Sequence, residues 1–174
     1  MSDAPAPSAA PGDFVYADVP NRAIAYIIDA IIVGVGVIVI GLILGAVGLG
    51  IGTVVGALVL FVIALAASAA YFVYTWTTMR ATIGMQALGM QVGNASDGAT
   101  LTQDQAIRRW LAISAPSIVA QALQPLPVIG SILGLAAFVW FVYLVYSTAQ
   151  SPTKQGWHDI FANTMVVKAA KRLG

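Results

Sequence analysis

Two long runs without a charged residue dominate the pattern along this chain. The first covers residues 30–79, about 50 residues, whereas about 20 residues are enough to cross the hydrocarbon core of a bilayer. It therefore predicts two membrane-spanning helices joined by a turn, near residues 22–46 and 52–76. The turn is indicated by closely spaced glycines, at Gly45, Gly48, Gly50 and Gly52.

The second uncharged run covers residues 110–153 and, at about 44 residues, is again too long for one span. The proline-containing segment 124–127 interrupts it, because proline cannot continue a helix. This predicts two more helices, near residues 105–123 and 128–148. The third of the four helices is short and contains Pro116, so a re-entrant or interfacial segment is its alternative.

The remaining polar segments predict a small second part. Residues 89–93 are typical of a short strand followed by a turn at 94–98, and residues 164–168 are typical of a second strand. We expect the two strands to pair and to tie the middle loop to the C-terminal segment. Before the second strand, three apolar residues have the spacing of an interfacial helix, namely Trp157, Ile160 and Phe161.

The composition places this pattern in a membrane. Of the 174 residues, 59% are hydrophobic and 9% are charged, and the mean hydropathy is +0.87, whereas roughly 25% of an ordinary soluble domain is charged. A soluble domain of this size cannot bury so much apolar surface. The lipid bilayer is therefore the expected partner of the chain.

The composition also argues against several classes of function. The chain has no cysteine and one histidine, so disulfides and a His-rich metal site are excluded and no cofactor is expected. No nucleophile motif is present, and the glycine-rich run 48–52 follows no strand that would make it a phosphate-binding loop. A net charge of +1 offers no basic patch for nucleic acid, and we expect no enzymatic activity.

The basic residues predict the orientation. All of them lie at the start of the first predicted span, between the second span and the start of the third, or after the fourth: Arg22, Arg80, Arg108, Arg109, Lys154, Lys168, Lys171 and Arg172. The positive-inside bias then places both termini and the middle loop in the cytoplasm. The expected fold class is an all-α integral membrane protein, a bundle of four transmembrane helices with a small cytoplasmic loop and strand pair, multi-pass in the plasma (inner) membrane.

Asp29 is the one charged residue inside a predicted span and away from its membrane edge. It follows Arg22 by seven residues, so it lies on nearly the same helix face and about 10 Å deeper. A carboxylate at that depth costs about 2.5–3.5 kcal/mol and should face the bundle interior with a partner or a proton. Two interpretations stay open, a structural pin that pairs with a basic residue and an ion or proton site.

Arg22 is unusual at the start of a helix. Asn21 is a good N-cap residue, which would make Arg22 the first helical residue, where a cation opposes the helix dipole. The arginine therefore suggests a specific acceptor, a carboxylate or a lipid phosphate. The alternative is an anchor whose charged end reaches the membrane surface.

His158 and Asp159 follow the fourth predicted span. Neighbours in sequence point to different faces of a helix, so a catalytic pair is not expected. Asp159 should accept hydrogen bonds from Arg22, from Arg108 or Arg109, or from backbone amides of its own turn. His158 is expected at the surface, where it could titrate near neutral pH.

Three segments together resemble the RDD family of membrane proteins. They are residues 21–29 with Arg22 and Asp29, residues 82–92 in the middle loop, and residues 158–164 with Asp159. That family is named for one arginine and two aspartates, the arginine opening the first helix and the first aspartate lying inside it. The resemblance implies that these three charged residues matter, and transport of some ligand has been suggested for the family.

The resemblance extends over nearly all of residues 16–168. It implies a membrane domain over 19–168. The segment 1–18 is rich in Ala and Pro and lacks Lys and Arg, so we expect a disordered cytoplasmic tail there, and residues 169–174 are expected to form a basic C-terminal tail. Members usually carry basic residues just after the loop glycine, where this chain has Met85 and Gln86.

Two functions follow as hypotheses. The first is transport of a proton, cation or small ligand, with Asp29 as the binding group gated by Arg22 and Asp159. Four helices enclose little space, so a homo-oligomer or a larger membrane complex would complete the pathway. The alternative is a non-catalytic accessory subunit of a larger membrane complex. A third possibility is a sensor of lipid headgroups that uses its membrane-edge arginines, Arg22, Arg80, Arg108 and Arg109.

Overall fold

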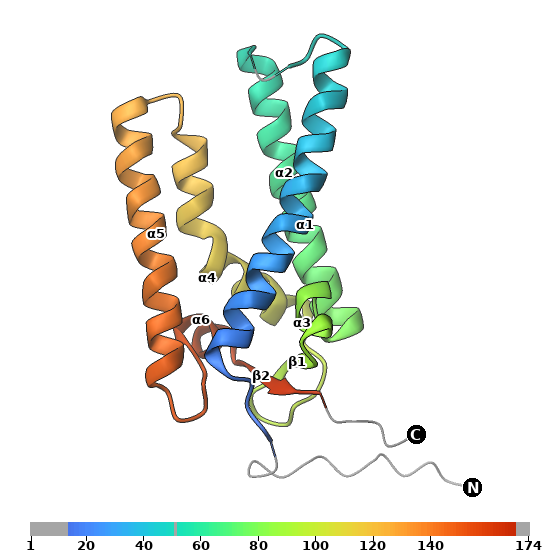
Figure 1. The fold of residues 1–174 in the computed structure, drawn as a ribbon, viewed down its shortest axis with the longest axis vertical. Coiled ribbons are helices and arrows are strands. Elements are labelled where there is room, and N and C mark those ends of the chain that lie inside the picture. The colour runs from blue at the N-terminus through green and yellow to red at the C-terminus, as the bar shows by residue number, and fades with distance from the viewer. Residues whose placement is uncertain (1–13, 51, 170–174) are drawn as a thin grey trace, which may run out of the picture.

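Four long helices form two pairs that meet at one end and diverge towards the other (Figure 1). The computed structural model describes residues 14–50 and 52–169. The first pair consists of α1 (Val19–Ala46) and α2 (Val54–Tyr74), and the second of α4 (Gln103–Ala122) and α5 (Pro127–Gln150). Each pair is joined by a short turn at its outer end, so its two helices run in opposite directions.

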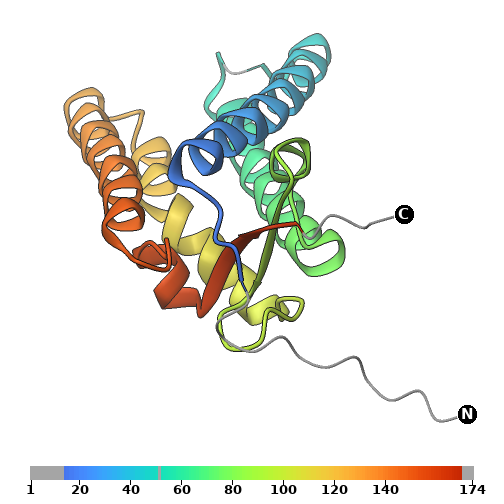
Figure 2. The same ribbon diagram turned by 60° about the horizontal axis from the view of Figure 1, so that its bottom comes forward.

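Short elements occupy the end where the two pairs meet. A π-helical turn, η1 (Thr75–Met79), extends α2 and leads into α3 (Ile83–Ala87) and β1 (Met90–Asn94), and α6 (Trp157–Ala162) precedes β2 (Thr164–Lys168). The strands pair antiparallel, with Val92 opposite Val166, and lie between the two helix pairs (Figure 2). The strand pairing expected from the sequence is therefore present, whereas its location on the cytoplasmic side stays a prediction.

The last residues of the predicted N-terminal tail are ordered. Ala17 is buried and its amide donates to the carbonyl of Val166 at 3.0 Å, and the amide of Lys168 donates to the carbonyl of Val15 at 2.8 Å. Residues 14–18 therefore lie along β2 and are not a disordered tail. The rest of the predicted tail, and the C-terminal tail beyond residue 169, fall outside the described residues.

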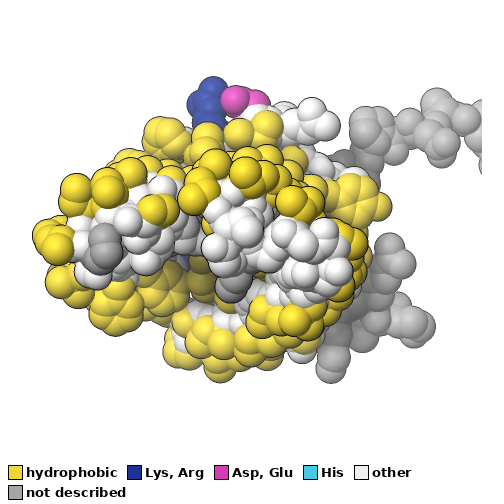
Figure 3. Space-filling model, turned by 90° about the horizontal axis from the view of Figure 1, so that it is seen from above, with side chains coloured by type: hydrophobic (Ala, Val, Ile, Leu, Met, Phe, Trp, Pro, Cys, Tyr) yellow, Lys and Arg dark blue, Asp and Glu magenta, His cyan; other side chains and the backbone are white. Residues whose placement is uncertain are grey.

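Three segments are long and apolar enough to cross a membrane: Val19–Ala46, Val54–Met79 and Val128–Gln150. At most 11% of the most apolar window in each is buried within the chain, so lipid or another protein must cover these helices. Hydrophobic side chains also dominate the outer end of the molecule (Figure 3). The helix α4 is more polar and is not among the three, so the fourth span stays a prediction.

The predicted helix ends agree with the structure to within four residues, but the start of α1 differs in its cap. Asp18, not Asn21, is the N-cap residue, because its carboxylate accepts the amide of Asn21 at 3.0 Å. Pro20 lies in the first turn, where a missing N–H costs nothing. Arg22 is consequently one turn inside the helix, and the first turn of α1 fixes the direction in which its side chain leaves the helix.

The apolar core lies where the helix pairs meet. It combines residues from the helices, the middle loop and both strands, including Ala25, Phe72, Trp76, Met85, Val92, Trp110 and Val166. α3 lies directly against α1 at Gly84, where a Cβ atom would be 2.2 Å from the carbonyl oxygen of Ala25. Only glycine permits this approach.

We expect Gly84→Ala to lower the thermal unfolding midpoint of the detergent-solubilised protein, because the new methyl group overlaps the α1 backbone. Overpacking of this kind costs about 1–3 kcal/mol. Gly34→Ala is the matched control, since nothing lies within 4 Å of a Cβ atom there. Equal midpoints for the two variants would contradict the close contact between α1 and α3.

Candidate functional site

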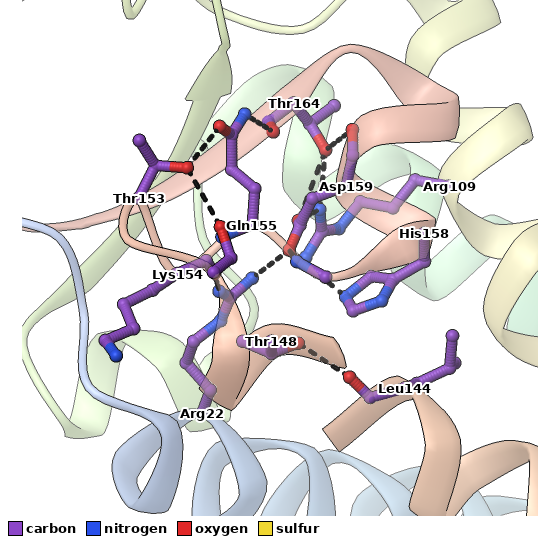
Figure 4. A network of polar contacts seen from close by, with 12 residues as sticks. Arg22, Arg109, Leu144, Thr148, Thr153, Lys154, Gln155, His158, Asp159 and Thr164 are labelled. Carbon is purple, nitrogen blue, oxygen red and sulfur yellow. Dashed lines mark hydrogen bonds and ion pairs between the residues drawn. The ribbon is translucent and has the colours of Figure 1, made fainter. Parts of the chain in front are cut away.

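One buried carboxylate joins the two helix pairs. Asp159, in α6, has no exposed surface, and its Oδ2 accepts from Nη2 of Arg22 at 2.5 Å and from the amide of Gly156 at 3.0 Å. Its Oδ1 accepts from Nη1 of Arg109. Since Arg22 belongs to α1 and Arg109 to α4, the carboxylate bridges elements that are far apart in the chain (Figure 4).

Backbone and hydroxyl groups complete the shell around the two arginines. Nη1 of Arg22 donates to the carbonyl of Lys154, and Nη1 of Arg109 donates to Oγ1 of Thr164 at 2.6 Å. The carbonyl of Thr164 in turn accepts from the side chain of Gln155 at 2.9 Å. A guanidinium presents several donors in a fixed plane, so each arginine can hold the carboxylate and a neighbouring oxygen at once.

The cluster formed by Arg22, Asp159 and Arg109 is ionised and carries a net positive charge. Burial alone would raise the pKa of Asp159, but the guanidiniums of Arg109 and Arg22 hold that pKa well below its usual range. Asp159 is therefore a carboxylate throughout the physiological pH range. Two arginines face one aspartate, which leaves one positive charge in excess.

His158 is buried, contrary to the expectation of a surface residue. Its Nε2 lies 3.4 Å from Oδ2 of Asp159, although the two are neighbours in sequence. The ring lies over Gly156, where a Cβ atom would be 2.8 Å from Cε1 of His158 and 2.2 Å from Oγ1 of Thr148. Burial lowers the pKa of His158 to about 4, so the imidazole is neutral at pH 7 and does not titrate near neutral pH.

Arg108 lies outside the cluster. Its side chain is 56% exposed and forms an ion pair of 2.9 Å with Asp104, one turn earlier in α4. Of the two adjacent arginines that the sequence offered as partners of Asp159, the structure places only Arg109 beside it.

Asp29 has a different environment. It is 2% exposed and accepts three hydrogen bonds, from the hydroxyl of Tyr71 at 2.7 Å, from Oγ1 of Thr82 at 2.5 Å and from the amide of Gly84 at 2.8 Å. All three donors are neutral. Among the described residues no basic side chain pairs with Asp29, and the carboxylate instead connects α1 to α2 and α3. A structural pin and an ion or proton site both stay open as interpretations, the pin with neutral partners.

Asp29 and the two arginines that bind Asp159 line one cavity. Arg22, Asp29, Arg109 and His158 line a space of about 100 Å³ where the helix pairs meet. Since a water molecule needs at least about 10–15 Å³ measured in this way, several waters fit. The remaining lining is largely apolar and aromatic, with Tyr26, Phe72, Trp76, Phe141 and Leu144 among its residues.

Sequence reasoning missed the partners of Asp29. Thr82 caps α3 by accepting the amide of Met85 at 3.2 Å, and a threonine three residues before Met85 is a recognisable capping signal. Tyr71 is one of several aromatic residues near the end of α2, where such residues are typical of the membrane surface. Nothing local in the sequence connects either residue with Asp29.

Comparison with protein families agrees with this geometry. A model described as the RDD family matches residues 16–163. The chain belongs to the RDD family. The match includes the long helices, α6 and all three charged residues that the resemblance implied, Arg22, Asp29 and Asp159. No curated protein and no solved structure matches this RDD family chain.

Asp159→Asn should destabilise this RDD family protein strongly, because two buried guanidiniums lose their anionic partner. Removing one partner of a buried pair costs about 3–5 kcal/mol. The control is Asp104→Asn, which removes an exposed pair worth at most about 1 kcal/mol. Thermal unfolding of the two variants in the same detergent measures the difference, and comparable losses would show that the bridge is not structural.

His158 gives a pH dependence whose sign is fixed by its lowered pKa. As pH falls below about 6.5, His158 becomes protonated in the unfolded chain. In the native protein the imidazole stays neutral until about pH 4, because its pKa is lowered. Stability should fall over this window by about 3 kcal/mol at most. We expect the decrease in unfolding midpoint from pH 7 to pH 4.5 to be smaller in His158→Gln, and an unchanged decrease would exclude His158 as its source.

Proposed function

We propose that this RDD family protein transports a proton or a small monovalent cation across the membrane, with Asp29 as the binding group. One observation carries the proposal. Asp29 is a buried carboxylate that faces a cavity and has only neutral hydrogen-bond donors among the described residues. A charge taken out of water without a counter-charge is costly, so the group gains from binding a proton or a cation.

The donors around Asp29 suit both ligands. The hydroxyls of Tyr71 and Thr82 can rotate and accept instead of donating, so either could accept the proton of a neutral Asp29. The same oxygens, together with the carboxylate, could contact a small cation. The amide of Gly84 cannot reverse its role and would hold one carboxylate oxygen in place in either state.

A route towards Asp29 is suggested by a second hollow. An open groove of about 670 Å³ lies between α1 and the α4–α5 pair. Tyr26 and Phe141 line both this groove and the cavity, and their ring centroids are 5.4 Å apart. Movement of these rings would connect the groove with Asp29, and opening of the bridge between Arg22 and Asp159 would release the ligand at the opposite end.

The accessory-subunit alternative has one observation in its favour. Nothing lies within 4 Å of a Cβ atom placed at Gly45, Gly52 or Gly134, so the side-chain position of each is open within the described chain. Small residues allow helices to approach closely in lipid, which would suit a partner helix.

Flux measurements in proteoliposomes test the proposal. The wild type should dissipate an imposed proton or sodium gradient, and Asp29→Asn should reduce that flux about tenfold or more, because the binding charge is lost. Asp104→Asn removes an exposed carboxylate that does not line the cavity and should retain full flux. Equal activity of wild type and Asp29→Asn would exclude Asp29 as the transport site, and two inactive proteins would favour the accessory subunit.

A further inference from the structure

Two buried N–H donors line the same cavity without an acceptor. Trp76, in η1, is 3% exposed and Arg109 is 4% exposed, and the guanidinium carbon of Arg109 lies 5.2 Å from the centroid of the Trp76 ring. Nε1 of Trp76 and Nε of Arg109 have no hydrogen-bond partner in the described part of the chain. Buried donors are nearly always satisfied in native proteins, so two neighbouring residues with free donors indicate a missing acceptor.

The charge beside Arg109 indicates that the missing acceptor is negatively charged. Arg22 and Arg109 share the single carboxylate of Asp159, which leaves one positive charge in excess. Asp29 is the one acidic side chain among the described residues lining the cavity, and its oxygens already accept three other hydrogen bonds. It also lies two helical turns, about 10 Å, from Arg22 along α1.

A neutral acceptor such as water would satisfy a donor but leave the excess charge unbalanced. Nδ1 of His158 is an acceptor when the neutral imidazole carries its proton on Nε2, beside Asp159, but it has no hydrogen-bond partner in the described part of the chain and so accepts from neither donor. A cavity of about 100 Å³ with aromatic walls admits a small ion with some water and excludes a large polyhydroxylated one.

We propose that this cavity binds one small monovalent anion, a halide or a short carboxylate such as formate, beside Trp76 and Arg109. The indole and guanidinium N–H groups donate to the anion, and the excess positive charge of the Arg22–Asp159–Arg109 cluster balances it. The anion site is distinct from Asp29 and does not require the chain to be a transporter.

Thermal unfolding of the purified chain tests the site without any transport. The sodium concentration and ionic strength are held constant while sodium gluconate, whose anion is too large, is replaced by chloride or by formate. A ligand that binds the native state raises the unfolding midpoint with saturation. We expect saturable stabilisation by at least one of the two small anions. The anion that stabilises at the lower concentration, chloride or formate, shows whether the site prefers a halide or a carboxylate. No stabilisation beyond gluconate by either anion would overturn the proposal and leave only water in the cavity.

Trp76→Phe keeps an aromatic ring beside Arg109 but removes its N–H. It should raise the anion concentration needed for half-maximal stabilisation about tenfold or more, because a hydrogen bond to a charged group is lost. Trp140→Phe is the matched control, since its N–H donates to the carbonyl of Ala112 at 2.9 Å and the residue does not line the cavity. An anion response of Trp76→Phe identical to that of Trp140→Phe would also overturn the proposal.

Two further measurements keep the test decisive if Trp76→Phe does not fold. Bromide should quench the tryptophan fluorescence of the wild type with saturation, over the concentrations at which it stabilises, whereas purely linear quenching would count against a site. Asp29→Asn should bind the anion more tightly, because it removes a negative charge from the same cavity, and weaker binding would contradict this placement. Since neither measurement uses flux, the anion site and the transport proposal can fail separately.

Discussion

The fold depends on the carboxylate of Asp159, which accepts hydrogen bonds from Arg22 of α1 and Arg109 of α4 at once. Apolar packing joins the two helix pairs only at the end where they meet, because the pairs diverge and the apolar windows of the three candidate spans are at most 11% buried. In lipid there is no strong hydrophobic drive for helices to associate. Specific polar contacts and close backbone approaches must therefore fix where the pairs meet. A buried ion cluster suits that task only when its groups are largely satisfied, and here each carboxylate oxygen accepts at least two donors.

Asp29 complements this bridge two turns further along α1. It connects α1 to α2 through Tyr71 and to α3 through Thr82 and Gly84, and α3 leads directly into β1. The two aspartates therefore have different surroundings although both belong to the site where the helices converge. Asp159 is surrounded by positive charge and stays ionised, whereas the hydrogen-bond donors of Asp29 are neutral. Such a contrast between two carboxylates in one site is typical of proteins that use one group for structure and the other for chemistry.

The sequence predicted most of what depends on local pattern. The uncharged runs, the glycine turn and the proline break placed the four long helices, and the short apolar segments placed both strands. It could not choose between Arg108 and Arg109, because adjacent helical residues point about 100° apart and the facing side depends on tertiary packing. The burial of His158 depends in the same way on Gly156 and Thr148. The partners of Asp29 lie 42 to 55 residues away in the chain, beyond the reach of any local signal.

The distribution of charge links the two proposals physically. The excess positive charge lies at the end of the cavity formed by Arg22, Asp159 and Arg109, and Asp29 lies about two helical turns away along α1. A proton or cation bound at Asp29 would offset the one negative charge in the cavity that opposes an anion beside Arg109. Each ligand would therefore favour the binding of the other, and the coupling is necessarily reciprocal. A cavity of this kind would hold a proton and an anion together more readily than it holds either alone.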